Sequence, residues 1–383
     1  MLSKGMNSSK PLSCDSVYHN WDRRRENVEV TRDERLGWVL TRHADVLDAL
    51  HRPEVFSNQV STHLSVPNGM DPPIHAPFRR LVEGFFTAER MDAFSPVCRK
   101  TAAMLVQGLT TSEPIDAMAA LGLPYAARVQ CRFLGWPTEM EAALLDWADR
   151  NLRAIRELDR PALAENAHRF ENLILGELRR RREARHEWDV TGLLLRGHVD
   201  GRPLTDAELV SLLRNWTAGE IGTISASVGI LIHFLAGHPD VQTELRAHPE
   251  RIPGATNEIL RMRGPLLTNR RRTLCPVRVG DTLIPADAPV TLHWVAANRD
   301  PRAFPDALAF QPGRAPDRSL LFGAGIHVCP GEPLATLELR LLLEELLVQT
   351  DSFTPLPDRP SRPAEAPLGG YADVWLRLHA AKE

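Results

Sequence analysis

The sequence predicts a mainly α-helical protein with a small β-rich region. From Pro77 to Arg185, apolar residues recur at three- and four-residue spacing with breaks at prolines, which indicates several amphipathic helices in succession. A very apolar helix follows Thr205, and a leucine-rich helix covers Leu334–Leu347. Between them, the stretch PVRVGDTLIPADAPVTLHW alternates apolar and polar residues around a Gly-Asp turn, as strands of a small sheet do.

The first elements are short. Trp38–Leu40 predicts a strand, and the helical pattern after it ends near Pro53. Residues 57–73 are rich in Ser, Asn, Pro and Gly and predict a long loop. Loops of this length inside a compact domain are usually functional, so we expect this one to lie near a binding site.

A capping box, Thr205–Glu208, opens the very apolar helix, which is predicted to run to Gly237. Apolar residues surround most of its circumference, so we expect a buried central helix. Pro239 and Pro253 stand where two further helices would begin. No repeat or linker divides the chain, which predicts a single domain over residues 1–383, with residues 1–35 an irregular amino-terminal segment.

Composition restricts the classes of function. The 383 residues are 43% hydrophobic and 25% charged with a net charge of −3, which is typical of an ordinary globular protein with a large core. No long basic arm is present, so we expect no nucleic-acid partner. The amino end has no apolar signal core and no long hydrophobic span, so we expect no membrane anchor and a cytoplasmic location. Five widely separated cysteines fit reduced thiols.

The segment Phe322–Gly331, with the sequence FGAGIHVCPG, carries the chemistry. It combines a glycine-rich loop, the single thiol of Cys329 and a helix that follows at once. Glycines let a backbone turn tightly and approach a flat ligand, while free amides and a helix amino end stabilise a thiolate. A thiolate ligand pushes electron density onto heme iron and favours cleavage of an O–O bond.

These residues resemble the cysteine-ligand loop of the cytochrome P450 family, whose pattern is Phe-Gly-x-Gly-x-His-x-Cys-x-Gly, and every fixed position is met. The resemblance implies the family's mostly helical, single-domain fold and a heme b cofactor (iron protoporphyrin IX), with Cys329 as the ligand of the iron. It also places Phe322, Gly323, His327 and Gly331 at the cofactor.

Other segments resemble the same family in the right order. Glu258 and Arg261 match its Glu-x-x-Arg, and Arg314 matches the third member of its buried ion network. The segment DPPIHAPFRR resembles the family's source of ligands for the heme propionates, which implies His75 and Arg79. One arginine of RRR is expected to join them, and we choose Arg271 over its neighbour Arg270. The resemblance covers most of the chain.

The central helix departs from the family. Where the family has Ala/Gly-Gly-x-Asp/Glu-Thr, this chain has Ala218-Gly219-Glu220-Ile221-Gly222-Thr223. Ile221 and Gly222 replace the acid and the alcohol, and neither relays protons. Glu220 and Thr223 are displaced by one residue, about 100° around the helix. We therefore treat Gly222, Glu220 and Thr223 as the distal catalytic candidates. Either Gly222 opens a groove for water or a substrate hydroxyl, or it serves close packing alone.

The resemblance implies an oxidoreductase, a monooxygenase that inserts one oxygen atom from O2 into a small-to-medium, mostly apolar substrate. No dinucleotide-binding motif is visible, so electrons are expected from a ferredoxin and its NAD(P)H-dependent reductase. The alternatives are a peroxide-driven oxygenase and a non-catalytic heme protein. The expected pocket lies among residues 57–73, a helix-loop-helix lid near residues 140–185, the central helix at Trp216–Gly222, and Leu266–Asn269.

Overall fold

The computed structural model describes residues 14–109, 113–157, 159–184, 189–366 and 368–381. Most of these residues are helical, as expected. The α-helices are α1 Cys14–Asn27, α2 His43–His51, α3 His75–Glu83, α4 Ala88–Gln107, α5 Leu123–Leu134, α6 Glu139–Arg156, α7 Arg160–Ala184, α8 Val190–Leu195, α9 Asp206–Ala236, α10 Pro239–Ala247, α11 Ile252–Arg263, α12 Trp294–Asn298 and α13 Glu332–Gln349.

The strands form one sheet of five strands and several smaller sheets. The large sheet has the order β1-β2-β10-β7-β3, with β1 Val30–Asp33, β2 Gly37–Leu40, β3 Phe56–Ser57, β7 Thr268–Thr273 and β10 Pro289–His293. The smaller sheets are β8 Val277–Val279 with β9 Thr282–Ile284, β5 His198–Val199 with β6 Arg202–Pro203, β12 Arg362–Pro363 with β13 Tyr371–Asp373, and β11 Thr350–Pro355 with β14 Trp375–Ala380 and β4 Ile115–Asp116.

The predicted strand at Trp38–Leu40 and the helix after it are confirmed as β2 and α2. The alternating stretch before residue 294 divides in two. Its first part makes the β8–β9 hairpin, and its last part, β10, joins the large sheet between β2 and β7. In that sheet Val290 pairs with Arg271, which fixes the register of β7.

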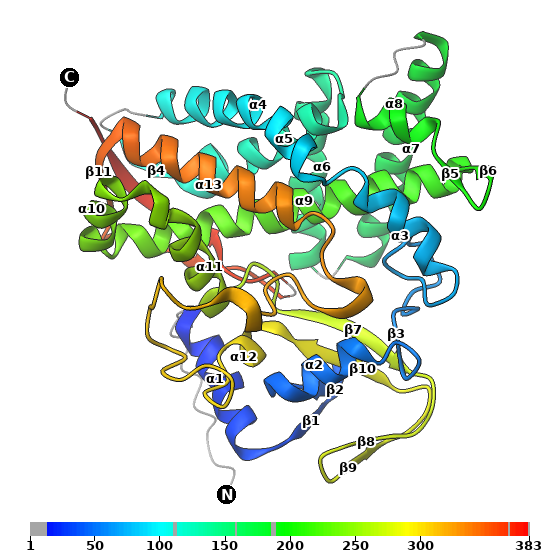
Figure 1. Cartoon of the computed structure of the whole chain (residues 1–383). Coiled ribbons are helices and arrows are strands. Elements are labelled where there is room, and N and C mark those ends of the chain that lie inside the picture. Colours follow the sequence, from blue (N-terminus) through cyan, green and yellow to red (C-terminus); the bar gives the residue numbers. More distant parts are fainter. Residues whose placement is uncertain (1–13, 110–112, 158, 185–188, 367, 382–383) are drawn as a thin grey trace, which may run out of the picture.

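The central helix is α9, which crosses the molecule (Figure 1). Its capping box is formed: the Thr205 hydroxyl accepts from the Glu208 amide, and the Glu208 carboxylate accepts from the Thr205 amide. By length and composition α9 could span a membrane, but 67% of its most apolar window is buried inside the protein. That burial is what we expect of a core helix, and α5, α7, α11 and α13 pack on it.

The cysteine loop lies between two layers of the fold. α13 packs along α4 and also touches α9, while the β-rich region lies on the other side of the loop (Figure 1). Leu334, Leu337, Leu341 and Leu342 of α13 are buried, which explains its leucine-rich sequence. The loop therefore starts from the β-rich side and ends on a helix anchored in the core.

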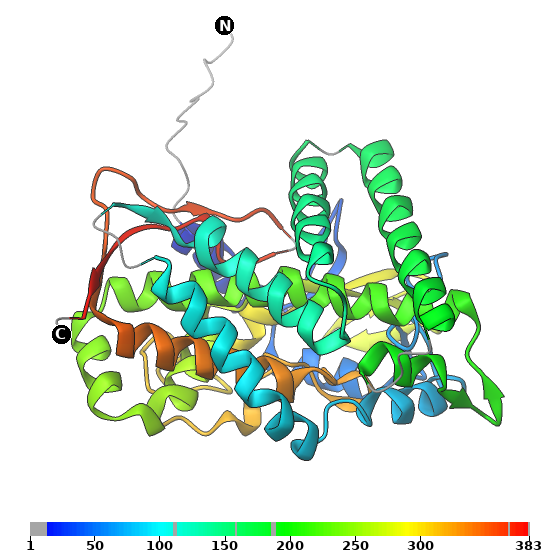
Figure 2. The same ribbon diagram turned by 90° about the horizontal axis from the view of Figure 1, so that it is seen from above.

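The expected helix-loop-helix lid consists of α6 and α7, which rise from the body as an antiparallel pair (Figure 2). Trp147 of α6 stacks on Phe170 of α7 with ring centroids 4.5 Å apart, and the Asn166 amide donates to the Trp147 carbonyl. A hollow of about 450 Å³ opens between the two helices. Residue 185, the end of the predicted lid, lies outside the described residues.

The prediction of an irregular segment over residues 1–35 is wrong for its described part. Residues 14–27 form α1 and residues 30–33 form β1; residues 1–13 lie outside the described residues. Buried ion pairs hold α1 in place: Asp22 accepts from Arg299 at 2.6 Å and from Arg25 at 2.8 Å, and Arg25 also donates to the Ala296 carbonyl. Because most residues of α1 are polar, the spacing of its few apolar residues does not predict a helix.

Candidate functional site

Cys329 sits in a tight loop immediately before α13. Its amide donates to the Phe322 carbonyl at 2.8 Å, which closes the loop Phe322–Gly331 on itself. The Gly331 amide donates to the Cys329 sulfur, one of the amides that the sequence led us to expect there. The thiol is half-buried and free of any disulfide. The loop thus presents one sulfur at a fixed position near the start of a helix.

Two glycines make this loop possible. Gly323 and Gly325 have φ angles of +74° and +69°, a region that side-chain-bearing residues rarely adopt. A Cβ on Gly325 would lie 2.3 Å from the Leu50 carbonyl oxygen of α2. Because that oxygen belongs to the backbone, it cannot move aside cheaply. Gly325 therefore lets the loop pass directly over the end of α2.

Burial raises the pKa of the Cys329 thiol to about 11, and this effect exceeds the lowering by the Gly331 amide and by Arg79. The nearby carboxyls of Glu332 and Glu220 raise it further. Without a bound cation, burial therefore outweighs the Gly331 amide and Arg79 at this sulfur. A bound metal ion supplies the missing positive charge, because the thiolate is the form that coordinates metal.

His75, Arg79, Arg271 and His327 gather beside the loop from α3, β7 and the loop itself. The rings of His75 and His327 lie 4.4 Å apart, and Arg79 donates to the Val328 carbonyl. Burial lowers the pKa of His75. It also lowers the pKa of Arg271 to about 10 and that of His327 to about 3. Positive neighbours contribute to the lowering at both histidines. The cluster is thus rich in buried donors, and the carboxylates that act on it are Glu83, which pairs with Arg79 at 2.7 Å, and Asp71.

Strand alternation separates the three arginines of β7. Arg271 is buried, whereas Arg270 and Arg272 are exposed, since successive side chains of a strand point to opposite faces. The pairing of Arg271 with Val290 of β10 sets this orientation. The structure therefore places Arg271, and not Arg270, on the inner face of the sheet.

The described residues fit heme b. The Nε2 atoms of His75 and His327 are buried and have no hydrogen-bond partner, an arrangement that costs free energy unless a ligand completes it. Two carboxylates placed here would accept from these donors, and heme b carries two propionates. On α9, a Cβ on Gly219 would meet nothing within 4 Å, and Ala218 is exposed, so the helix leaves open space at these two positions.

The comparisons decide the family. The family model described as Cytochrome P450 matches residues 161–369. Cyclomarin C epoxidase CymV of Salinispora arenicola is 33% identical over 347 residues, which cover 86% of this chain and 87% of that protein. The chain belongs to the cytochrome P450 family.

Other relatives of this P450 agree. Erythromycin C-12 hydroxylase of Saccharopolyspora erythraea is 31% identical over 345 residues, 86% of each protein. A mutant of P450 EryK solved in complex with erythromycin B superposes with a TM-score of 0.89 at 27% identity, covering 96% of this chain and 98% of that one. The predicted fold class is confirmed. This P450 is a heme b-dependent monooxygenase, an oxidoreductase that binds a small substrate and takes electrons from a redox partner.

The ion network of this P450 is formed by Glu258, Arg261 and Arg314. Arg261 donates to both carboxylate oxygens of Glu258, at 2.7 and 2.9 Å, and Arg314 donates at 3.0 Å. Arg261 also donates to the carbonyls of Asn298 and Ala307, which lie in and after α12. The pKa of Glu258 is lowered, because the bonds to both arginines outweigh burial. The network ties α11 to the irregular segment that precedes the cysteine loop.

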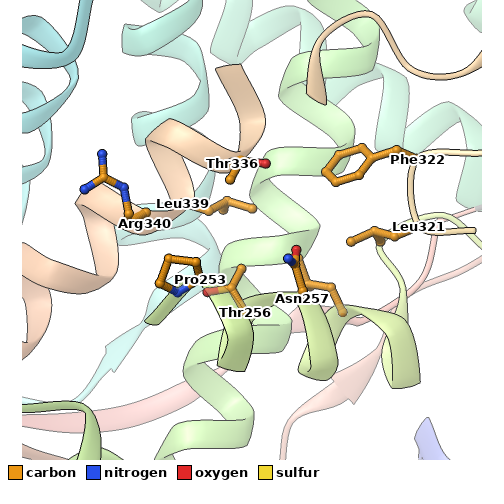
Figure 3. A pocket seen from close by; sticks show the side chains of 9 residues that line it. Pro253, Thr256, Asn257, Leu321, Phe322, Thr336, Leu339 and Arg340 are labelled. Carbon is orange, nitrogen blue, oxygen red and sulfur yellow. The ribbon is translucent and has the colours of Figure 1, made fainter. Parts of the chain in front are cut away.

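Phe322, the first residue of the cysteine loop, turns its ring toward a small cavity between α11 and α13 (Figure 3). Thr256 and Asn257 of α11 and Thr336 of α13 are among the other residues that line it. Its volume is about 10 Å³, enough for roughly one water molecule. The cavity lies behind the loop and is too small for an organic substrate.

On α9, Gly222 has room for a side chain. A Cβ there would meet only the Leu368 Cδ2 atom, at an ordinary contact distance of 3.7 Å. Close packing therefore does not explain this glycine. The Thr223 hydroxyl is bonded to its own helix, through the Gly219 carbonyl at 2.8 Å. Glu220 turns to α13, where its carboxyl interacts with that of Glu338, so it does not occupy the position of the missing acid.

Glu338 and Ser225 are two residues near the site that were not predicted from the sequence. Glu338 is an acid on the buried face of a leucine-rich helix, and that misplaced polar residue was the available signal. The Ser225 hydroxyl donates to the Ile221 carbonyl at 2.6 Å, and it lies 3.2 Å from the Gly222 carbonyl oxygen. Such bonds back to the helix often bend it. They occur one turn after the segment where the acid and the alcohol are replaced.

Proposed function

We propose that Cys329 ligates the heme iron of this P450 and that His75, Arg79, Arg271 and His327 bind the heme propionates. The two buried, partnerless imidazole nitrogens support this assignment best. Phe322, Gly323 and Gly331 shape the loop around the sulfur. Glu258, Arg261 and Arg314 maintain the segment that leads into this loop. All of these residues belong to one domain spanning residues 1–383.

With the heme bound, thiolate-ligated iron supplies the activation of O2, one atom of which is inserted into the substrate. The chain's own residues exclude water, orient the substrate and provide protons. The named relatives include hydroxylases and an epoxidase. We infer that this P450 likewise hydroxylates or epoxidises a mostly apolar organic compound.

The substrate would enter between residues 57–73 and the lid of α6 and α7. The long loop is tied to the start of α9: the Val66 amide donates to the Ser211 hydroxyl at 2.8 Å, and Asn215 donates to the Val66 carbonyl at 3.2 Å. These bonds hold the loop against the part of α9 that precedes Gly222. Leu266–Asn269, at the start of β7, would complete the pocket.

Trp216 is a poor candidate for the pocket lining. Its ring contacts Phe85 and Phe86, with centroids 5.5 and 5.4 Å away, and Phe86 also borders Gly331. The Trp216 ring is thus occupied by contacts with these two phenylalanines. The part of α9 that faces substrate is then Ala218–Gly222, and the proposed lining is reduced accordingly.

We infer that the electrons come from a ferredoxin and its NAD(P)H-dependent reductase and that the protein works in the cytoplasm. The peroxide-driven alternative would need no such partner. The two are separated by supplying hydrogen peroxide alone: efficient product formation without ferredoxin would favour the peroxide-driven oxygenase.

The decisive experiment is the carbon monoxide difference spectrum of the dithionite-reduced holoenzyme. A Soret band at the strongly red-shifted position of thiolate-ligated heme would support Cys329 as the ligand, and Cys329→Ser should abolish that band. A band at the ordinary heme position in fresh, intact protein would argue against the assignment. Substrates can then be screened by the spin-state change that accompanies their binding.

A further inference from the structure

Two carboxyl groups meet in the interior beside the heme site. Glu220 belongs to α9 and Glu338 to α13, helices that contact each other. Glu338 is fully buried, and both of its carboxyl oxygens lack a partner among the described donors. The Glu220 oxygen Oε1 is also buried without a donor. A buried carboxylate with no cation costs several kcal/mol, so this arrangement calls for a compensating feature.

The compensating feature is a proton. Each carboxyl lies within interaction range of the other, and a hydrogen bond between them requires a proton on one of them, because a carboxyl donates only when it is protonated. Burial raises the pKa of both groups, and the pKa of Glu338 is raised further by the charge of Glu220. The pair as a unit therefore holds at least one proton, and the charge of one member disfavours ionisation of the other.

The neighbours reinforce this state. Cys98 from α4 and Tyr125 from α5 face the pair, and the Tyr125 hydroxyl donates to the Glu338 backbone carbonyl at 2.8 Å. Cys329 lies close enough to Glu220 for their charges to interact. These groups are neutral or become negative on ionisation, so none of them stabilises a second carboxylate. A thiolate at Cys329 would strengthen the preference for protonated carboxyls.

The location connects the pair to the missing relay. Glu220 follows Gly219, where α9 has open space, and precedes the positions where Ile221 and Gly222 replace the acid and the alcohol. Within Ala218–Thr223, Glu220 is the single ionisable residue. A proton released from Glu220 has a short way to travel, through water, to the open space beside Gly219.

We propose that Glu220 and Glu338 form a proton-sharing carboxyl pair that supplies protons to the space beside Gly219, in place of the absent acid and alcohol. The pair alternates between two protons and one. When the Glu220 O–H bond breaks, its proton passes to water, and the carboxylate left behind accepts a hydrogen bond from protonated Glu338. A proton from solvent then restores Glu220. The inference rests on the monooxygenase function proposed above.

Infrared difference spectroscopy of the holoenzyme tests the proton itself. Wild type should show the carbonyl stretch of a protonated carboxyl, sensitive to D2O, and its intensity should fall as the pH rises through neutrality. Glu338→Gln and Glu220→Gln should each remove or shift that band. Glu345→Gln is the matched control, because Glu345 lies on the same helix but pairs with Arg99 at the surface, and it should leave the band unchanged. Absence of the band in wild type would overturn the proposal.

Coupling measurements test the role. Glu220→Gln should lower the product formed per electron several-fold and raise the solvent isotope effect, with an unchanged carbon monoxide spectrum, while Glu345→Gln should behave as wild type. Normal coupling in both Glu220→Gln and Glu338→Gln would overturn the role as a proton source. Failure of the monooxygenase function would instead appear as an abnormal carbon monoxide spectrum in wild type, and the infrared band would still decide whether the pair shares a proton.

Discussion

The rings of His75 and His327 lie 4.4 Å apart at an angle of 60°, and the Nε2 atoms of both are buried without a hydrogen-bond partner. One ring comes from α3 and the other from the cysteine loop, so residues 252 positions apart meet at one point. Together with Arg79 and Arg271 they form the cluster of donors proposed to bind the heme propionates. The prediction about Arg271 follows from this arrangement.

We expect Arg271→Ala to weaken heme retention and Arg270→Ala to leave it unchanged. Arg271 is buried, whereas Arg270 is exposed on the opposite face of β7. A hydrogen bond to a charged group contributes about 1.5–3 kcal/mol, which corresponds to roughly a tenfold or greater loss of affinity. The rate of heme transfer to apomyoglobin measures it. Equal rates for the two variants would exclude Arg271 as a propionate ligand.

We expect Glu258→Gln to destabilise the protein by about 3–5 kcal/mol, because it leaves two buried guanidinium groups without their carboxylate. Arg261 is fully buried, and Arg314 is largely so. Urea unfolding followed by circular dichroism gives the free energy. Glu165→Gln, which breaks an exposed pair with Arg169 on α7, is the control and should cost less than about 1 kcal/mol. A similar small cost at Glu258 would contradict the structural role of the network.

The pH dependence of stability follows from the carboxyl pair. Burial raises the pKa of Glu220 from its usual 4.5 to about 7 and raises that of Glu338, so the folded protein binds more protons than the unfolded chain. The contribution of Glu220 is fully present below pH 4.5 and is lost as the pH rises through 7, and that of Glu338 is lost as the pH rises through its own raised pKa. As the pH rises, the free energy of unfolding of wild type should fall, relative to that of the double variant Glu220→Gln/Glu338→Gln, by up to about 1.4 kcal/mol per pH unit for each proton. If the free energy of unfolding depends on pH in the same way in wild type and in the double variant, the raised pKa values are refuted.

Gly222→Thr should improve coupling if the open groove at this position holds water or a substrate hydroxyl now used as a proton donor. A threonine fits there, because the nearest atom to a Cβ is Leu368 Cδ2 at 3.7 Å. The measurements are product formed per electron and the solvent isotope effect. If both stay unchanged, the glycine has no part in proton delivery.

Gly325→Ala should impair heme incorporation and destabilise the protein by about 1–3 kcal/mol, because its Cβ collides with the Leu50 carbonyl at a positive φ. Gly313→Ala is the control, since a Cβ on Gly313 meets nothing within 4 Å. Heme content per protein and thermal unfolding measure the effect. Full heme content in Gly325→Ala would show that the loop can move away from α2.

Local sequence was sufficient for the cysteine loop, because one short segment supplies Cys329, His327 and the glycines that turn the backbone. Arg271 could be preferred by pattern, but its burial depends on the strand register with Val290. Glu338 could not be assigned a role, because its partner Glu220 lies on another helix 118 positions earlier and only packing brings the two together.

Contacts between distant segments also explain why the irregular segment predicted at the amino end was wrong. The helix α1 has the sequence CDSVYHNWDRRREN, whose polar residues give no amphipathic pattern. Its position depends on buried contacts of Asp22 and Arg25 with residues 296–300. Sequence patterns report burial of apolar surface, and they do not reveal ion pairs between distant segments.

Those ion pairs impose an order on synthesis. Asp22 leaves the ribosome 277 residues before Arg299, the cation that it binds most closely. Until then, Arg25 has no Ala296 carbonyl to bind, and α1 has no site in which to settle. In the nascent chain, α1 therefore cannot dock until the central helix and most of the core have been synthesised. Docking of α1 then indicates that the polypeptide is nearly complete.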